Sequence, residues 1–120
     1  MANEGYFSVE TKFDKGGVSV NARKSGRFLV TGDNASKTPQ SIGTSAETVT
    51  FAGITGAPQL LMISNLDSTN FIEIGGDSGL TVFKLKLLAG MTNLISLSSA
   101  TLYAKADTAA VRIQVVPVEL

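Results

Sequence analysis

Residues 101–116 read TLYAKADTAAVRIQVV, and this stretch decides the fold class. Small or branched apolar residues occupy every second position of its two halves: Leu102, Ala104, Ala106, Val111, Ile113 and Val115. Side chains that alternate in this way point to opposite faces of a β-strand, so each half predicts a strand with one buried face. The pair Asp107-Thr108 predicts the turn that joins the two strands.

The same period of two extends over most of the chain. Further strands are expected at residues 7–13, 18–22, 28–31, 47–51, 60–64, 71–74, 81–87 and 93–97. The best helical candidate, residues 84–94, is interrupted by Gly90 and fits a strand period better. Short strands at this spacing are typical of sandwiches and barrels. We therefore expect an all-β chain, with residues 1–120 forming a single-domain, antiparallel, jelly-roll-like β-sandwich of roughly 8–10 short strands.

Turn and loop signals separate these strands. Asp14-Lys15-Gly16-Gly17 predicts a hairpin turn, and Pro117 ends the last strand or places it on a sheet edge. Residues 60–64 are almost continuously apolar, as expected for a central strand covered on both faces. Residues 32–46 carry the longest loop signal, with Ile42 as a single apolar anchor. This loop is either an ordered arm that holds a partner or a mobile surface loop.

Composition excludes several classes of function. The 120 residues include 10 Lys plus Arg and 10 Asp plus Glu, and this zero net charge argues against nucleic acid or an anionic membrane as the main partner. The absence of Cys and His excludes disulfides, thiol or histidine catalysis, and zinc sites with these ligands. We expect no enzymatic activity, no cofactor and no metal. No apolar run is long enough to span a membrane and no secretory signal is visible, so synthesis in a cytoplasm is expected.

Gly76-Asp77-Ser78-Gly79 resembles the nucleophile segment of serine proteases. A serine hydroxyl needs a base to act as a nucleophile at neutral pH, and the chain has no histidine. Lys84 or Lys86 could form a Ser-Lys dyad, but both fall at solvent-facing strand positions. A glycine-rich turn between two strands is the favoured interpretation.

Two other segments carry weaker functional signals. Residues 32–38 resemble a phosphate-binding loop but lack its second glycine, and Pro39 follows in place of a helix. Oxygen ligands for calcium could come from Asn65, Asp67, Asn70 and Asp77, although the alternating acidic pattern of a calcium loop is missing. Asn and Asp also stabilise turns by bonding their own backbone, and this interpretation is favoured.

The chain has one basic cluster, Arg23-Lys24-Ser25-Gly26-Arg27. Residues 1–44 carry six basic and four acidic groups, a net charge of +2, and residues 45–120 carry four basic and six acidic groups, a net charge of −2. A dipole of this kind could help neighbouring subunits dock. A solvated hairpin is the favoured interpretation of the cluster.

Large apolar side chains are abundant relative to charge. Val, Leu, Ile and Phe number 10, 12, 7 and 6, whereas charged residues make up only 17% of the chain. A small sandwich would struggle to bury all of them, and exposed apolar patches usually mark contacts. A monomer with zero net charge would also be poorly soluble. We therefore expect a homo-oligomer that covers these surfaces, with a trimer favoured.

Four segments in order carry a resemblance to a known group of proteins: GTSAE at 43–47, SNLDSTNFIEIG at 64–75, KLLAG at 86–90 and LYAKADTAAV at 102–111. Together they resemble small virion proteins encoded in the structural-gene clusters of tailed bacteriophages, over about residues 16–120. The resemblance implies a non-enzymatic β-sandwich in the phage particle. A capsid decoration or cement role is favoured. The alternatives are a structural protein of the tail, neck or baseplate, and a module that binds a host-surface glycan or receptor.

The expected partner is therefore the major capsid protein or a tail protein, in a virion assembled in the host bacterial cytoplasm. Weak contacts repeated over a lattice would hold such a protein by avidity. Residues 1–5 are a possible N-terminal arm, and this arm, the 32–46 loop and the basic cluster are the expected contact segments. Within and beside them, the candidate partner-binding residues are Tyr6, Arg23, Lys24, Arg27, Lys37 and Ile42.

Overall fold

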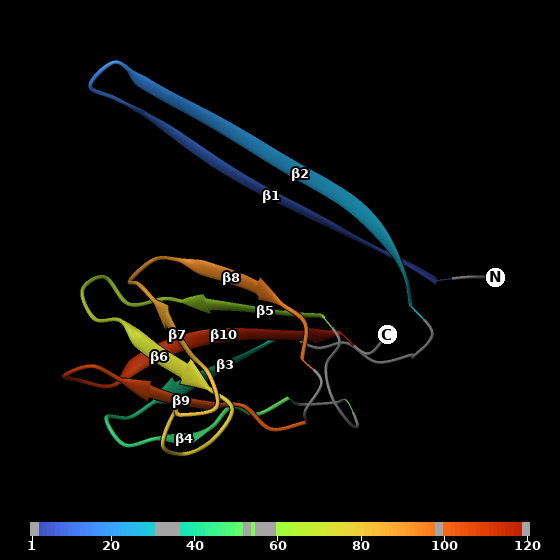
Figure 1. Cartoon of the computed structure of the whole chain (residues 1–120). Helices are drawn as coiled ribbons and strands as arrows, with labels where there is room; N and C mark the ends of the chain where they lie inside the picture. The colour runs from blue at the N-terminus through green and yellow to red at the C-terminus, as the bar shows by residue number, and fades with distance from the viewer. Residues whose placement is uncertain (1–2, 31–36, 52–53, 55–59, 98–99, 119–120) are drawn as a thin grey trace. The chain divides into compact units, whose positions relative to one another are not determined.

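The computed structural model describes residues 3–30, 37–51, 54, 60–97 and 100–118. Within these ranges all regular structure is strand, and every strand pairing is antiparallel (Figure 1). The ten strands are β1 (Asn3–Lys15), β2 (Val18–Val30), β3 (Thr38–Ile42), β4 (Glu47–Thr48), β5 (Leu60–Asn65), β6 (Ile72–Gly75), β7 (Lys84–Leu87), β8 (Thr92–Ile95), β9 (Tyr103–Ala106) and β10 (Val111–Val118). The all-β class expected from the period of two is confirmed.

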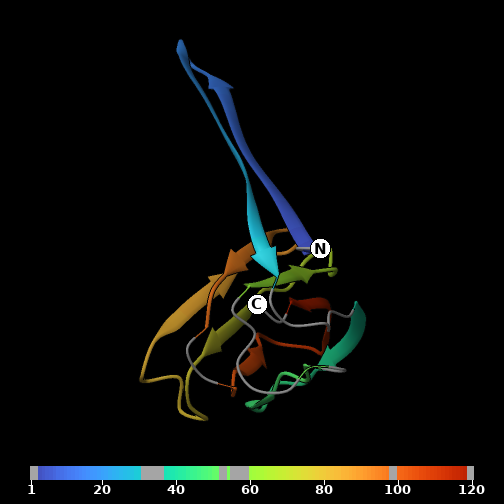
Figure 2. The ribbon, with the colours of Figure 1, turned by 90° about the vertical axis from the view of Figure 1, so that its right-hand side faces the viewer.

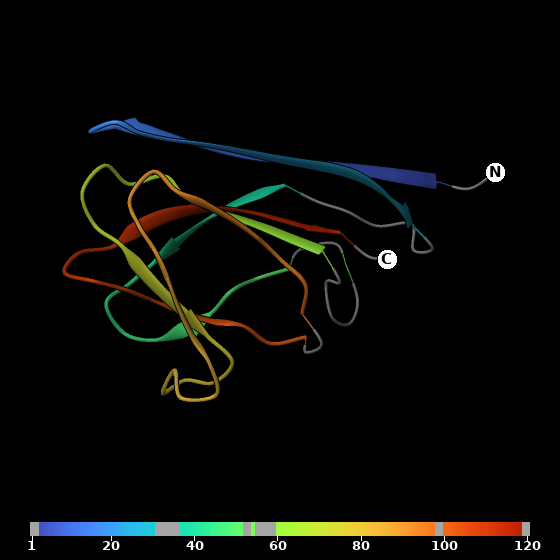
Figure 3. The same ribbon diagram turned by 45° about the horizontal axis from the view of Figure 1, so that its top comes forward.

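The chain divides into two compact units, Met1–Thr31 and Gly32–Leu120, where the sequence analysis expects one domain. The first unit contains β1 and β2, which pair with each other along their full 13-residue lengths (Figure 3). Their turn has Gly16 at φ 63° and Gly17 at φ 80°. Glycine adopts positive φ without steric cost, and a two-residue turn of this geometry matches the twist of a hairpin. The hairpin turn expected at the Gly-Gly pair is confirmed.

The expected break around residues 23–27 is wrong, because β2 runs through this segment without interruption. The sequence pattern predicts two short strands, 18–22 and 28–31, on either side of a polar cluster. In the structure each residue of the cluster has a partner on β1, from Arg23 opposite Glu10 to Arg27 opposite Tyr6. Cross-strand pairing with β1 therefore overrides the local loop-like composition. Residue 31 lies outside the described residues.

The second unit contains two four-stranded sheets, with strand orders β3-β10-β5-β8 and β4-β9-β6-β7. Figure 2 shows the ribbon from a second direction. One cluster of buried side chains receives residues from strands of both sheets, so the two sheets share a core between them. Its members are Ile42, Val49, Leu61, Ile63, Ile72, Ile74, Leu87, Leu102, Ala104, Ala106, Val111, Ile113 and Val115. The alternation predicted for residues 101–116 is confirmed, because the six apolar residues that define it all lie in this core.

The central strand expected at residues 60–64 is confirmed as β5, but it is not buried on both faces as expected. It pairs with β10 on one side and β8 on the other. Its burial alternates, with Leu61, Ile63 and Asn65 buried and the residues between them half-buried. The run of apolar residues therefore has one face in the core and one face that is partly open to solvent, as in an antiparallel sheet with one solvated side.

Residues 38–42 correct the expected long loop. They form β3, which pairs with β10 at the edge of its sheet, and Ile42 is fully buried. Pro39 fits here because an edge strand can lack one backbone donor. Residues 32–36 lie outside the described residues. The possible arm at residues 1–5 also changes, since residues 3–5 pair with β2 and residues 1–2 lie outside the described residues.

Pro117 does not end β10, which continues to Val118. It pairs with Leu61 of β5, whereas pairing with β3 on the other side stops at Val115. Among the described residues, Pro117 therefore has a strand partner on one side only, as expected for a proline at an edge position.

The segment 81–87 is a strand only from Lys84 onward. The expected core face of Thr81, Phe83, Leu85 and Leu87 is wrong except for Leu87, because Phe83 and Leu85 are 36% and 38% exposed. The preceding loop is held by hydrogen bonds to Asp77 that shape it as a turn. This loop geometry delays the start of the strand and leaves the two apolar side chains at the surface.

Candidate functional site

The β1–β2 hairpin carries four of the six residues expected to bind a partner. Residues directly opposite each other in an antiparallel pair share a face. Tyr6 lies opposite Arg27 and Glu10 lies opposite Arg23, all on one face, whereas Lys24 lies opposite Val9 on the other face. The structure therefore brings Tyr6, Arg23 and Arg27 together and separates Lys24 from them.

The face with Tyr6 is the polar face of the hairpin and carries charges of both signs. Among the side chains that the structure describes, its basic residues are Lys12, Arg23 and Arg27, and its acidic residues are Glu10 and Asp14. Because Glu10 lies directly opposite Arg23, the cluster at 23–27 is not an unopposed basic patch. Opposite charges in such a cross-strand pair stabilise the hairpin modestly.

The other side is the apolar face of the hairpin, formed by Phe7, Val9, Thr11, Phe13, Val18, Val20 and Ala22, together with Lys15 and Lys24. The large side chains of Val9, Phe13, Val18 and Val20 are between 47% and 54% exposed. Phe7 is half-buried because its ring crosses Gly26, where an added Cβ would lie 2.8 Å from the ring atom Cε1. The hairpin is therefore an amphipathic ribbon. The period of two in residues 7–13 and 18–22 signals this face, but only the register shows that both strands present it on the same side.

The two remaining expected residues lie in the second unit. Lys37 is exposed immediately before β3, where a partner could reach it. Ile42 is fully buried in the core, so its side chain is not available to a partner. The apolar anchor of the expected loop is thus a structural residue.

The second unit has an apolar cleft that the sequence analysis missed. The cleft has a volume of about 550 Å³ and involves β7 and β8, which are edge strands of the two sheets. It is lined by Gly76, Val82, Phe83, Leu85, Ile95, Ser96, Leu97 and Thr101. Among the described residues, Val82 is the most exposed large apolar side chain, at 72%. The period of two predicted that Phe83 and Leu85 are buried in the core, and no local sequence signal distinguished burial in the core from exposure at a sheet edge.

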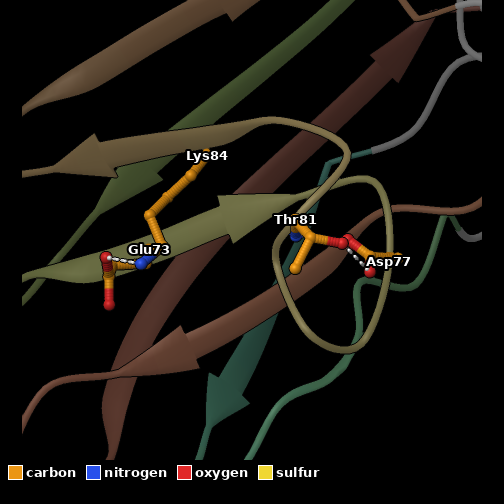
Figure 4. Close-up of polar contacts among 4 residues, drawn as sticks. All are labelled: Glu73, Asp77, Thr81 and Lys84. Atoms are coloured by element: carbon orange, nitrogen blue, oxygen red, sulfur yellow. Dashed lines mark hydrogen bonds and ion pairs between the residues drawn. The ribbon is translucent and has the colours of Figure 1, made fainter.

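The Gly76–Gly79 segment is a turn held by Asp77 (Figure 4). The Asp77 carboxylate accepts hydrogen bonds from Thr81 N at 2.6 Å, Thr81 Oγ1 at 2.7 Å and Val82 N at 3.0 Å. The Thr81 hydroxyl, followed by the Val82 and Thr81 amides, lowers the pKa of Asp77 below its usual 3.8. These contacts give Asp77 a structural role in forming the loop beside the apolar cleft.

The two lysines considered for a Ser-Lys dyad have other partners. Lys84 Nζ lies 3.2 Å from Glu73 Oε2 (Figure 4), and Lys86 Nζ lies 4.0 Å from the centroid of the Phe71 ring. The Lys84–Glu73 contact is an ion pair near the surface, which contributes little to stability. The two ammonium groups lie along the β6–β7 pair, and Ser78 is exposed in the turn. Each lysine therefore has a contact other than Ser78, and these contacts give no support to a Ser-Lys dyad.

The turn at Asn65–Asn70 uses the oxygen atoms that were considered as calcium ligands. Asp67 Oδ2 accepts hydrogen bonds from Asn70 N at 2.6 Å and from Thr69 N at 3.0 Å, and Asn65 Oδ1 accepts one from Asp67 N at 2.8 Å. The amides of Asn70 and Thr69 lower the pKa of Asp67 below its usual 3.8. Among the described residues, no three acidic side chains gather closely enough to hold a metal ion.

Comparisons of the chain with protein-family models, with curated proteins and with solved structures found no match. The described residues contain no helix of the length and hydrophobicity needed to cross a membrane. The surfaces described above are therefore the structural basis for a functional proposal, together with the resemblance carried by the sequence.

Proposed function

We propose that this protein is a non-enzymatic structural component of a tailed-bacteriophage particle, which decorates the capsid lattice as a homo-oligomer, with a trimer favoured. The observation that carries the proposal is the amount of apolar side chain that the fold leaves at its surface. In the part of the chain that the structure describes, the large exposed apolar residues are Tyr6, Val9, Phe13, Val18, Val20, Leu66, Val82, Phe83, Leu85, Leu88 and Met91. They occur in both units, in a chain of zero net charge, and large apolar patches mark interaction surfaces.

The strand order of the second unit supports this proposal. Numbered from β3 to β10 as the first to the eighth strand, one sheet has the order 1-8-3-6 and the other has the order 2-7-4-5. We interpret this order as a jelly roll, in which two Greek-key motifs form eight strands in two sheets. Jelly rolls occur in viral capsid proteins, among other classes. The fold alone does not define a function, so the phage assignment also depends on the four resembling segments.

The location in the particle is tested by labelling intact virions of the phage that encodes this chain. Antibodies raised against the purified protein would be visualised by electron microscopy, with virions from a phage deleted for the gene as the matched control. Gold particles distributed over the head are the expected result. Labelling confined to the tail, neck or baseplate would overturn the decoration role and favour the tail-associated alternative. Virions without label above the control would contradict a place in the particle.

The contact with the capsid is tested by binding in solution. Capsids purified from the deletion phage would be mixed with the protein and sedimented, with lysozyme, a soluble protein of similar mass, as the control for trapping. Saturable co-sedimentation is expected, because weak contacts repeated over a lattice act together. No co-sedimentation above the lysozyme control at micromolar concentrations would contradict the proposal.

A further inference from the structure

The two sheets of the second unit are bridged along one side and open along the other. On the bridged side the edge strands are β3 and β4. Gln40 connects this side, because its Nε2 donates to Thr48 O at 2.9 Å and its Oε1 accepts from Thr50 N at 2.9 Å. On the open side the edge strands are β7 and β8, and residues of both line the apolar cleft. Ile95 and Leu97 line this cleft and also pack against the buried core, so the cleft is an opening into the side of the core.

The strand that forms one wall of the cleft has a backbone edge that can accept another strand. In the part of the chain that the structure describes, β7 pairs with β6 alone. Backbone amides and carbonyls along the open edge of a sheet can form hydrogen bonds with an extended peptide. A small apolar molecule would use the cleft and leave these groups unused, whereas an extended peptide would use both. The combination therefore favours a peptide as the occupant.

The side chains of β7 indicate which residues an added strand would carry. Leu85 lines the cleft, whereas Lys84 and Lys86 are exposed on the opposite face of the strand. Side chains of paired strands alternate in step. A strand added to β7 would therefore place every second side chain in the cleft and the others beside the two lysines. Apolar residues suit the first set, and acidic residues suit the second.

Charge on the outer face of the β6–β7 pair complements acidic residues in the added strand. Lys84, Lys86 and Glu73 are the charged residues of these two strands, which gives the pair a net charge of +1. Lys84 Nζ lies 3.2 Å from Glu73 Oε2, and the Lys84 side chain is still 54% exposed. Lys105 and Asp107 lie on and after β9, which β6 separates from β7. The two lysines of β7 are therefore the charges nearest to a strand added at its open edge.

The loop that precedes β7 shapes the same wall of the cleft. Leu80 has a φ of 55°, a strained conformation for a branched residue, and its side chain is only 7% exposed. The Asp77 carboxylate accepts hydrogen bonds from the amides of Thr81 and Val82, which follow directly (Figure 4). Val82 is thereby held 72% exposed beside the cleft. Because this wall is already shaped, a peptide would bind it without the cost of ordering the loop.

We propose that the cleft between β7 and β8 binds an extended peptide segment of a partner protein, which adds to the open edge of β7 with alternating apolar and acidic side chains. The apolar side chains enter the cleft, and the acidic ones lie beside Lys84 and Lys86. This inference goes beyond the proposed function, because it assigns a peptide-binding site to the second unit whether or not the chain decorates a capsid.

The test uses a nine-residue peptide of alternating valine and glutamate, capped at both ends and labelled with fluorescein. Fluorescence anisotropy during titration with the full-length protein should show saturable binding with a Kd of about 10–100 μM, because the strand edge is short and the cleft is small. One control peptide has the same composition with its valines in a single block, and a second is the alternating peptide N-methylated at every backbone amide. Both controls should bind at least about tenfold more weakly. No binding of the alternating peptide at roughly 300 μM protein, or equal binding of either control, would overturn the inference.

Variants of the full-length protein place the binding in the cleft. Val82→Thr combined with Leu85→Thr makes the lining polar without adding charge, and should weaken binding of the alternating peptide at least about tenfold. The matched control, Leu66→Thr combined with Leu88→Thr, changes two exposed apolar residues outside the lining and should bind as the wild type does. Circular dichroism checks that both variants fold. Equal peptide affinity of the two variants would overturn the inference. A cleft variant that lowers the mass measured by light scattering but keeps its peptide affinity would also overturn it, and would identify a second copy as the occupant.

Single charge removals test which strand edge is used. Lys86→Gln removes a positive charge beside the open edge and should weaken binding about 1.5- to 5-fold. Lys105→Gln removes the same charge from β9, on the far side of β6, and should have a smaller effect. A larger effect of Lys105→Gln would contradict the assignment to β7. These measurements use purified protein and synthetic peptides, whereas labelling of virions decides the decoration role, so failure of one is distinguishable from failure of the other.

Discussion

Asn65 is the one buried polar side chain among the described residues, and its replacement by alanine should destabilise the second unit strongly. It lies at the end of β5 and is 2% exposed. Its Nδ2 donates to Asn70 O at 2.9 Å and to Leu87 O at 3.1 Å, and its Oδ1 accepts from Asp67 N at 2.8 Å. One side chain therefore ties the β5 end, the following turn and the end of β7 together.

The magnitude follows from these three hydrogen bonds. Two of them are partly buried, and losing each costs about 1 kcal/mol because water can replace the missing partner in part. The bond to Leu87 O is buried, and leaving that carbonyl without a donor costs about 1–3 kcal/mol. Asn65→Ala should therefore lower the free energy of unfolding by about 3–5 kcal/mol, a large part of the about 5–15 kcal/mol typical of a domain.

Asn65→Asp is the sharper variant because it nearly preserves the shape of the side chain, replaces the amide donor by an oxygen and adds a negative charge at neutral pH. At neutral pH its carboxylate would face the carbonyl oxygens of Asn70 and Leu87, so it should be at least as destabilising as Asn65→Ala. Protonation supplies one donor, and this variant should therefore lose less stability relative to wild type as the pH falls through the pKa of the new aspartate.

Urea unfolding followed by circular dichroism at one fixed protein concentration measures these effects, since association also changes apparent stability. Ser64→Ala is the matched control on the same strand. It removes an exposed hydrogen bond to Thr92 Oγ1 and should cost less than about 1 kcal/mol. If Asn65→Ala were no more destabilising than Ser64→Ala, or if the Asn65→Asp deficit did not change with pH, the structural role assigned to Asn65 would be refuted.

Three further predictions concern other parts of the chain. Hydrogen bonds lower the pKa of Asp67 and Asp77 in the folded state. The stability that they contribute is complete above about pH 4 and is lost as the pH falls through the folded-state pKa values. When acid lowers the pH, the double variant Asp67→Asn, Asp77→Asn should therefore lose less free energy of unfolding than the wild type. Ile42→Ala should lower the free energy of unfolding in urea by about 2–5 kcal/mol because Ile42 is fully buried. The control Val82→Ala, at an exposed position, should change it by no more than about 0.5 kcal/mol. Similar values for the two variants would contradict the burial of Ile42. Gly17→Ala places a side chain on a residue with φ 80°, a strained backbone conformation for alanine. Hydrogen exchange of the hairpin amides should therefore accelerate roughly 5- to 30-fold, while the β5 and β10 amides keep their wild-type rates. Unchanged exchange of the hairpin amides would contradict the turn at Gly16-Gly17.

The amphipathic hairpin and the apolar cleft show how much of the candidate surfaces could be predicted. Alternation in residues 7–13 and 18–22 indicated strands with one apolar face, and the Gly16-Gly17 pair indicated their turn. Which residues of the two strands share that face depends on the register of thirteen cross-strand pairs. Lys24 is separated from Arg23 and Arg27 by the alternation of side chains along β2, once residues 23–27 are known to be strand. The cleft could not be predicted, because the alternation at Phe83 and Leu85 is the same for a buried strand and for an exposed edge.

Structural features that depend only on residues close together along the chain could be predicted from the sequence. Every second position in residues 101–116 is apolar, and only an extended backbone places those side chains on one side, so the all-β class and the cores of β9 and β10 followed directly. The tertiary structure alone decided which strands became neighbours. It buried Ile42 within a segment of loop-like composition, extended β2 through a polar cluster, and left the apolar residues beside β7 at the surface. Burial and pairing are long-range events whose free energy depends on residues distant in sequence, and local composition does not encode them.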